Sequence, residues 1–186
     1  LRCSRSAAAI RPLPIGRISI SSDWAYLRKS YTIRAIPNAA PLFVERVAVD
    51  GTTRWRGTAT VTLRKGNWSA GLSGYYIGPF SDSGSVATAA QYAALGNPNY
   101  LSKTFDSGAF TYRYIVKDTV TVNSFFSYRF DGHWNRYLGN ATVRLGVVNV
   151  ADIAPPLSVG QFHYNTSVYT GLLAGRTWTM EATKSF

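Results

Sequence analysis

The carboxyl-terminal stretch Trp178-Thr-Met-Glu-Ala-Thr-Lys-Ser-Phe186 alternates between apolar and polar residues along most of its length. Trp178, Met180 and Ala182 share one parity with the terminal Phe186, whereas Thr, Glu and Ser occupy the other parity. Because successive side chains of a β-strand point to opposite faces of its sheet, this stretch predicts a strand with one apolar and one polar face. The rest of the chain indicates whether that apolar face meets a protein core or lipid.

The same alternation recurs in five earlier segments. It is clearest between Arg54 and Arg64, where every even position is Arg or Thr and the residues opposite include Trp55, Val61 and Leu63. Each segment has about ten residues, which is longer than the usual soluble strand and matches the length that crosses a bilayer at a tilt. We predict six strands, near residues 17–28, 54–64, 67–80, 117–130, 139–150 and 175–186.

The predicted connections alternate between short and long. Residues 65–66 and 131–137 form short connections, whereas 31–53, 81–116 and 151–173 are long and rich in Gly, Pro, Asn, Ser and Tyr. Bacterial outer-membrane barrels combine short periplasmic turns with long extracellular loops. The fold class we predict is therefore all-β, a transmembrane antiparallel up-and-down β-barrel, of which this chain supplies about six carboxyl-terminal strands.

Aromatic residues fall near both ends of the predicted strands. An apolar band bounded by two headgroup layers produces two such girdles. The alternative is a soluble β-sandwich whose aromatic residues fill a core, although strands of this length are unusual there. The predicted outer girdle comprises Trp24, Tyr26, Trp55, Tyr76 and Trp178, and the inner girdle Trp68, Phe126, Tyr128, Phe130 and Phe186.

The net charge of +11 suggests a nucleic-acid partner at first reading. Nucleic-acid-binding proteins usually gather Lys and Arg on one helix or one surface patch, whereas the cations here are scattered through strand-like segments. We therefore predict no nucleic-acid partner and assign the charge to a polar lumen. No run of apolar residues reaches the length of about eighteen that a transmembrane helix needs, so such a helix is excluded.

No catalytic or metal-binding constellation is legible in the sequence. The single Cys3 excludes an internal disulfide and a cysteine-based zinc site. His133 and His163 fall in connections on opposite sides of the predicted membrane, so they do not share a metal. Asp23 and His163 could meet at the outer strand ends, which is the one enzyme alternative. The sequence predicts no enzyme, no metal and no cofactor.

One short helix is predicted inside the second long connection. The Ala-rich stretch Ser85–Leu95 has Ser85 as a candidate N-cap and Gly96 as a candidate stop. The alternative is an irregular loop.

Three ordered motifs in the last seventy or so residues resemble the carboxyl-terminal part of a TonB-dependent outer-membrane receptor. The first is the predicted strand 119–130, ending Ser-Tyr-Arg-Phe. The second, Leu145-Gly-Val-Val-Asn-Val-Ala-Asp-Ile-Ala-Pro-Pro156, is similar to the Asn-Leu-Phe-Asp element of that family, with Val150-Ala151 in place of Leu-Phe. The third is Gly175-Arg-Thr-Trp178 leading to Phe186, with Lys184 where the family commonly has an apolar residue.

The resemblance implies a barrel of about 22 strands around an amino-terminal plug. Residues 1–15 are expected to be a preceding strand end and periplasmic turn, and residues 16–186 the carboxyl-terminal barrel segment, with the plug absent. The chain is thus expected to be a fragment or a truncated product. The implied location is the bacterial outer membrane, and the implied partners are outer-membrane lipid, the barrel-assembly machinery and, through the missing plug, the TonB energy-transducing complex. The assembly signal is assigned to Trp178, Met180 and Phe186.

The function that the resemblance implies is binding and TonB-coupled import of a scarce nutrient, such as a ferric siderophore. An Arg pair near the barrel mouth would favour an anionic ligand, although Arg54 and Arg56 could instead pair with carboxylates of the plug or wall. The alternatives are a passive porin or structural outer-membrane barrel, and a soluble basic β-domain. The candidate ligand-binding residues are Arg54, Arg56, Tyr75, Phe162, His163 and Tyr164.

Overall fold

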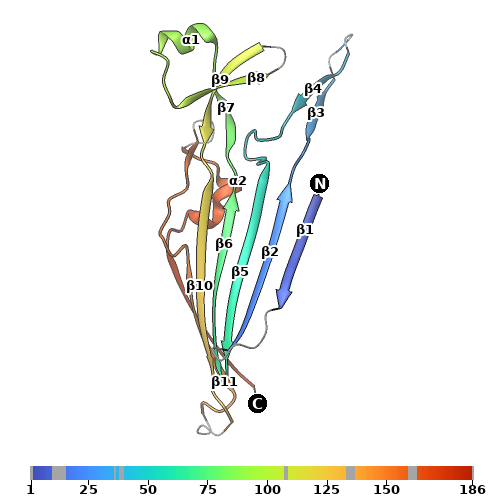
Figure 1. The fold of residues 1–186 in the computed structure, drawn as a ribbon. Helices are drawn as coiled ribbons and strands as arrows, with labels where there is room; N and C mark the ends of the chain where they lie inside the picture. The colour runs from blue at the N-terminus through green and yellow to red at the C-terminus, as the bar shows by residue number, and fades with distance from the viewer. Residues whose placement is uncertain are drawn as a thin grey trace.

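The computed structural model describes residues 2–9, 16–35, 37, 40–106, 109–132, 137–158 and 163–185. Strands account for 58% of the chain and helices for 8%, and the sheets are antiparallel, which confirms the predicted all-β class. The main sheet has seven strands in simple chain order, each antiparallel to its neighbours (Figure 1). They are β1 (Arg2–Ala9), β2 (Arg17–Tyr26), β5 (Trp55–Lys65), β6 (Trp68–Ile77), β10 (Thr119–Arg129), β11 (Ala141–Val148) and β14 (Thr177–Lys184).

Six of these seven strands coincide with the predicted segments. The seventh, β1, pairs with β2 along its whole length, from Arg2 opposite Tyr26 to Ala9 opposite Ser19. Its sequence, Arg-Cys-Ser-Arg-Ser-Ala-Ala-Ala, lacks apolar and polar alternation, so the periodicity that identifies the other strands is missing here. The described strands form an open sheet with β1 and β14 at its edges, and they do not close into a barrel.

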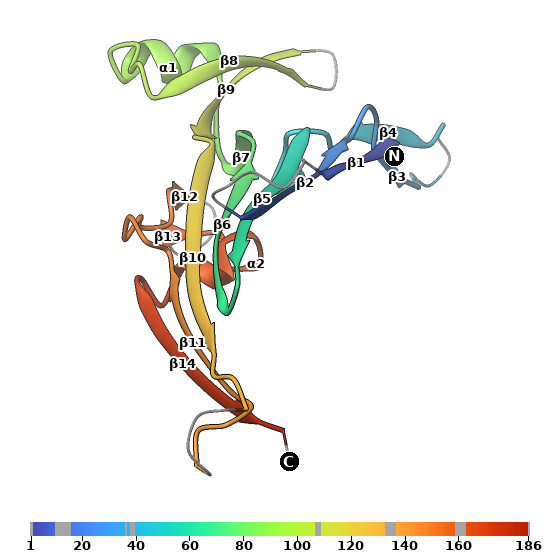
Figure 2. The same ribbon diagram turned by 60° about the horizontal axis from the view of Figure 1, so that its bottom comes forward.

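The long connections lie at one end of the sheet and the short turns at the other, as predicted (Figures 1 and 2). The first long connection contains the hairpin of β3 (Tyr31–Arg34) and β4 (Leu42–Glu45). The last contains β12 (Leu157–Ser158), β13 (His163–Tyr164), α2 (Thr166–Tyr169) and the 3-10 turn η1 (Thr170–Leu172).

The second long connection is more ordered than the sequence predicts. It forms a three-stranded sheet from β7 (Phe80–Ala87), β9 (Ala109–Val116) and β8 (Leu101–Asp106), with the helix α1 (Ala89–Ala94) between β7 and β8. The predicted helix exists, but the Ser85 cap is wrong because β7 continues through Ala87. Thr88 is the N-cap and forms a reciprocal capping box with Gln91. Gly96 follows the helix at φ +78°, as a stop residue should.

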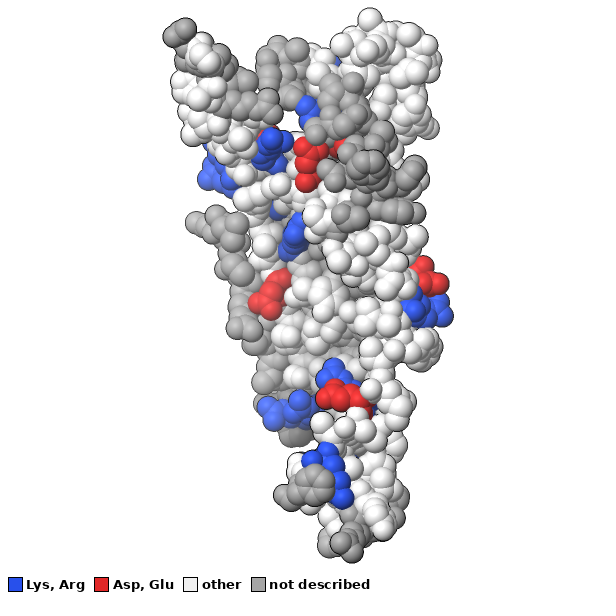
Figure 3. Space-filling view, turned by 180° about the vertical axis from the view of Figure 1, so that it is seen from behind, with Lys and Arg blue, Asp and Glu red and all other residues white. Residues whose placement is uncertain are grey.

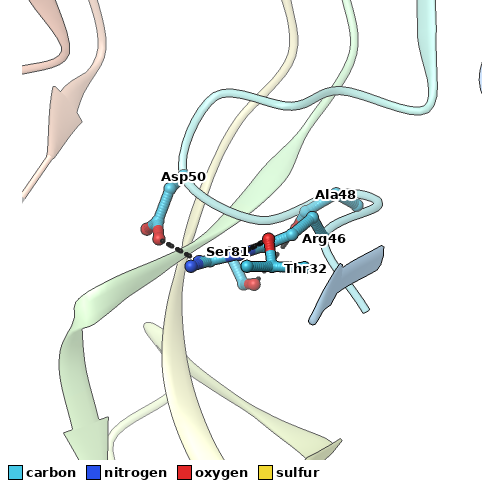
Figure 4. Close-up of polar contacts among 5 residues, drawn as sticks. All are labelled: Thr32, Arg46, Ala48, Asp50 and Ser81. Atoms are coloured by element: carbon cyan, nitrogen blue, oxygen red, sulfur yellow. Dashed lines mark hydrogen bonds and ion pairs between the residues drawn. The ribbon is translucent and has the colours of Figure 1, made fainter. Parts of the chain in front are cut away.

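Arg46 orders the turn that joins β4 to β5 (Figure 4). Its Nε donates to Thr32 Oγ1 at 3.2 Å, and its Nη1 forms an ion pair with Asp50 Oδ2 at 3.4 Å. The backbone N–H of Ser81 donates to the Ala48 carbonyl at 2.7 Å, and the Ser81 hydroxyl donates to the same oxygen at 3.1 Å. These contacts tie the first long connection to β7.

The buried core is small and lies at the end of the sheet that carries the long connections. Phe80, Val116, Tyr169 and Leu172 form its centre. Partly buried side chains packed against it are Ile77, Tyr114 and Val168. Along the rest of the sheet, the described residues form no further buried apolar cluster.

The chain exposes far more surface than a compact protein of its size. Its accessible surface is 13002 Å², whereas a compact monomer of 20.4 kDa exposes about 8,800 Å². An open sheet whose apolar face has no covering layer among the described residues contributes to this excess.

Candidate functional site

The strand register separates the main sheet into two chemically opposite faces. On one face, which we call the apolar face, large apolar side chains stand at most positions across the strands. One register row runs through Ile20, Val61, Leu72, Ser124, Val147 and Trp178, with Ser124 its one polar member. Many are exposed, including Leu72 at 55% and Trp178 at 73%. Exposed apolar patches of this extent mark interaction surfaces. At the β1 edge the row weakens, because the register brings Arg2 and Ser4 beside Tyr26 and Trp24.

Aromatic rings gather at both ends of the apolar face. At the end with the long connections, the ring centroids of Tyr26 and Trp55 are 4.6 Å apart, and those of Trp24 and Tyr76 are 6.0 Å apart. At the other end, Trp68 is 4.3 Å from Tyr128 and 4.9 Å from Phe126, and Tyr128 is 4.8 Å from Phe130. The strand register places Trp178, a member of the predicted outer girdle, level with Leu72 and not level with Trp24 and Tyr76.

A shallow groove crosses the apolar face beside Trp24. Gly57 lies directly beneath the Trp24 ring, so that any side chain at this position would collide with the indole. Ala59, two residues further along β5, is the register partner of Gly74 in β6, so both residues beside Gly57 on this face are small as well. The open space above Gly74, beside the Trp24 ring, is part of a cavity of about 200 Å³ that Trp24, Gly57, Ala59, Gly74, Tyr75, Tyr76 and Val120 line.

The opposite face, which we call the polar face, carries charged and hydroxyl side chains. Figure 3, which views the molecule from behind, shows charged side chains distributed along the length of the sheet. Thr60 and Ser73 are hydrogen-bonded across neighbouring strands at 3.2 Å. The polar face comprises Arg17, Ser19, Ser21, Asp23, Ala25, Arg56, Thr58, Thr60, Thr62, Arg64, Ser69, Gly71, Ser73, Tyr75, Ile77, Thr119, Thr121, Asn123, Phe125, Ser127, Arg129, Thr142, Arg144, Gly146, Val148, Thr177, Thr179, Glu181 and Thr183.

A second groove, of about 300 Å³, lies on the polar face. The Arg144 guanidinium carbon sits 4.3 Å from the centroid of the Phe125 ring, a cation–π contact. The ring itself lies over Gly71, where a side chain would collide with it. Tyr75 and Glu181 also line this groove, which therefore offers a cation, a carboxylate and aromatic surface.

The two predicted arginines have different contacts. Arg56 Nη2 donates to the Gly51 carbonyl at 2.7 Å and its Nε to Thr53 Oγ1 at 3.0 Å, so this side chain orders the turn before β5. Arg54 is exposed, and its Nη1 donates to the Tyr26 hydroxyl at 3.3 Å. These hydrogen bonds from the two guanidiniums go to a carbonyl and to hydroxyls, not to carboxylates.

The other predicted ligand residues are dispersed. Tyr75, 44% exposed, lines both grooves, and one further cavity of about 310 Å³ brings it together with Arg56. His163 and Tyr164 form β13, paired with Ser158 and Leu157. Phe162 and the terminal Phe186 lie outside the described residues, and Trp178 and Met180 stand on the exposed edge strand β14.

The last long connection folds back toward the polar face. Tyr169 of α2 is 1% exposed and packs on Phe80. Burial raises the pKa of its hydroxyl; nearby Asp118 adds to the effect, while Thr119 and Arg56 oppose it. No hydrogen bond of acceptable geometry reaches this hydroxyl from any described group.

Polar side chains hold the base of the same connection. Asn149, fully buried, donates through Nδ2 to the Ile153 carbonyl and accepts from the Ile153 N–H, both at 2.9 Å. Asp152 Oδ1 accepts from the Arg176 N–H at 2.8 Å. The Asn-Val-Ala-Asp motif is thereby joined to the Gly-Arg motif that precedes β14.

Sequence reasoning missed Arg144 and Phe125 of the polar-face groove, and the buried bond from Ser158 Oγ to Asp82 Oδ2 at 2.7 Å. The alternation of residues in β11 could have identified Arg144, because Arg144 and Thr142 both occupy polar-face positions of that strand. Ser158 and Asp82 are 76 residues apart, and no local pattern links them.

Across the described part of the chain, no group of three or more potential metal ligands comes together. Within the same ranges, no helix is both long and apolar enough to cross a membrane. Searches against protein-family models, curated proteins and solved structures found no match to this chain.

Proposed function

We propose that the chain is part of the wall of an outer-membrane β-barrel receptor that imports a scarce nutrient by TonB-coupled transport. The observation that carries the membrane part of this proposal is the exposed apolar face of the main sheet. In water such a face requires a second layer, whereas in a bilayer lipid covers it. The receptor part rests on the resemblance of the last three sequence motifs.

The strand arrangement supports a barrel wall in particular. Antiparallel strands in chain order, with long connections at one end and short turns at the other, match the connectivity of outer-membrane barrels. Aromatic clusters at both ends of the apolar face match two interfacial girdles. The unpaired edges of β1 and β14 would then continue into further strands, since open edges are not tolerated in lipid.

In this proposal the polar face lines the barrel interior. Its grooves and cationic side chains suit an anionic ligand with aromatic groups, such as a ferric chelate. Arg144 and Tyr75 replace Arg56 as the leading candidates for ligand contact from the barrel wall, because the Arg56 side chain is hydrogen-bonded within the turn before β5.

Two adjacent residues on opposite faces test the membrane assignment. Leu72→Lys would place an ammonium at the middle of the lipid-facing wall, at a cost of about 2–4 kcal/mol, whereas Ser73→Lys would place it in the lumen. We expect the full-length protein carrying Leu72→Lys to reach the outer membrane at a level reduced at least severalfold, measured by fractionation and heat-modifiable migration. Ser73→Lys is the matched control and should assemble near the wild-type level. Equal assembly of both variants would contradict the lipid-facing assignment.

A passive pore is the second candidate, favoured by the inward fold of the last long connection. Tyr169 lies close to Arg56 and Thr119 of the polar face, and a loop at this place would narrow an open lumen. The two candidates differ in energy dependence: import by a receptor stops when the inner-membrane proton gradient is collapsed, whereas diffusion through a pore continues. Uptake that persists without the gradient would favour the pore.

A further inference from the structure

We propose that the groove beside Trp24 on the apolar face binds an acyl chain of a phosphate-bearing anionic lipid, whose phosphate sits on Arg54. This inference rests on the proposed membrane function, because it takes the apolar face to be lipid-facing. It adds a specific lipid site to a face that otherwise meets bulk lipid.

The groove is shaped to receive a slender apolar group. Its floor is formed by Gly74 and Ala59, and its flanks by the Tyr76 ring and by the Trp24 ring, which covers Gly57. A hydrocarbon chain fits such a slot, since the slot offers dispersion contacts on several sides and few polar groups.

Cations cluster at the end of this groove where the long connections begin. Arg54 directly precedes Trp55, whose ring is paired with that of Tyr26. Its guanidinium has five N–H donors, and one of them is directed to the Tyr26 hydroxyl. The remaining donors are available for the bidentate contact that guanidinium makes with phosphate.

Further charges at the same end set the position of the headgroup. Arg28 and Lys29 are exposed and follow directly after β2, where they add positive charge on the Arg54 side. Asp118 lies beside Tyr76 on the other flank and would repel an anion. Charge complementarity therefore assigns the phosphate to the Arg54 side of the groove, above the acyl chain.

The test uses the full-length protein in detergent, incubated with equimolar dioleoyl phosphatidic acid and dioleoyl phosphatidylcholine, with retained lipid measured by native mass spectrometry. One interfacial cation favours an anionic lipid by about fivefold, from the typical energy per Lys or Arg. We expect at least that preference in the wild type and its loss in Arg54→Gln. The matched control, Arg64→Gln, removes an arginine from the other end of the same strand and should keep the preference.

A second variant tests the groove itself. Gly74→Val fills the slot, and its added Cβ would have only the Ala59 carbonyl oxygen, at 3.9 Å, within 4 Å. We expect retention of both lipids to fall severalfold. Equal retention of the two lipids by the wild type, an unchanged preference in Arg54→Gln, or unchanged retention in Gly74→Val would each overturn the site. Flotation with phosphatidylcholine vesicles distinguishes failure of the lipid site from failure of the proposed membrane function. A wild type that floats but shows no lipid preference refutes only the site. A wild type that does not float refutes the proposed function as well.

Discussion

Tyr169 shows how a single buried hydroxyl limits the conditions under which the last long connection stays folded. Its ring belongs to the small core, while its hydroxyl is buried without a well-formed hydrogen bond to a described group. Burial raises its pKa in the folded state above the ordinary value near 10. The stabilisation by the neutral ring is therefore fully present below about pH 10 and is lost as the pH rises through the higher folded pKa.

We predict that Tyr169→Phe keeps the ring packing and changes the free energy of unfolding at about pH 8 by less than about 1 kcal/mol, with stabilisation as the favoured sign. Between about pH 9 and pH 11 the wild type should lose stability more steeply than the variant. Urea unfolding in detergent micelles, followed by near-ultraviolet circular dichroism, measures both effects. Tyr100→Phe, at a position 56% exposed, is the control and should follow the wild-type pH profile. Parallel profiles for wild type and Tyr169→Phe would show that the hydroxyl does not ionise with unfolding.

Among the elements, the short strand β12 is joined to β7 by a buried side-chain hydrogen bond. Ser158, 2% exposed, donates to the Asp82 carboxylate at 2.7 Å. A hydrogen bond to a charged acceptor contributes about 1.5–3 kcal/mol. The bond spans the last and second long connections, so its loss should loosen the last connection without altering the main sheet.

We predict that Ser158→Ala speeds hydrogen–deuterium exchange of the peptide covering residues 163–173 by at least tenfold, and leaves exchange in β5 and β6 unchanged. An energy of about 1.5 kcal/mol corresponds to about tenfold in local opening. Ser167→Ala is the matched control, because the Ser167 hydroxyl donates within its own turn, to Asn165 Oδ1 at 2.6 Å. If both variants exchange alike, the bond to Asp82 does not anchor the connection.

The elements also differ in how far the sequence determines them. The six strands with strict alternation could be predicted, since parity, length and turn position all agree. The strand β9 carried a usable signal, because Phe110, Tyr112 and Tyr114 alternate with Thr111 and Arg113. The structure within the long connections otherwise depends on pairing between distant segments, which no local periodicity reveals.

The ligand candidates could be predicted less well than the strands. Parity identified the polar face, but only the contacts show that Arg56 is engaged with Gly51 and Thr53. The Arg144–Phe125 stack depends on Gly71 of a neighbouring strand leaving room for the ring. Such an arrangement follows from cross-strand register, which sequence spacing alone does not fix.

At the scale of the whole molecule, the surface is too large and too apolar for a compact protein in water. The exposed 13002 Å² exceeds by about half the area expected for this mass. Part of the excess is the apolar face, and part is the unpaired backbone of two edge strands, which promotes association with other chains. Both must be covered, the first by apolar surroundings and the second by strand pairing.

We therefore predict that the 186-residue chain, refolded from denaturant without detergent, sediments as large aggregates, whereas detergent present during refolding yields small particles with strand-rich circular dichroism. The matched variant carries Val61→Thr, Leu72→Thr and Leu145→Thr, which replace three exposed side chains of the apolar face by polar ones and keep residues that favour strands. It should stay dispersed at several times higher concentration without detergent, because the remaining edges alone associate more weakly than edges and face together. Sedimentation velocity at matched concentrations measures the difference. A wild-type chain that sediments as a monomer in plain buffer would mean that its apolar face is covered from within, as in a soluble β-domain, and that lipid is not its solvent.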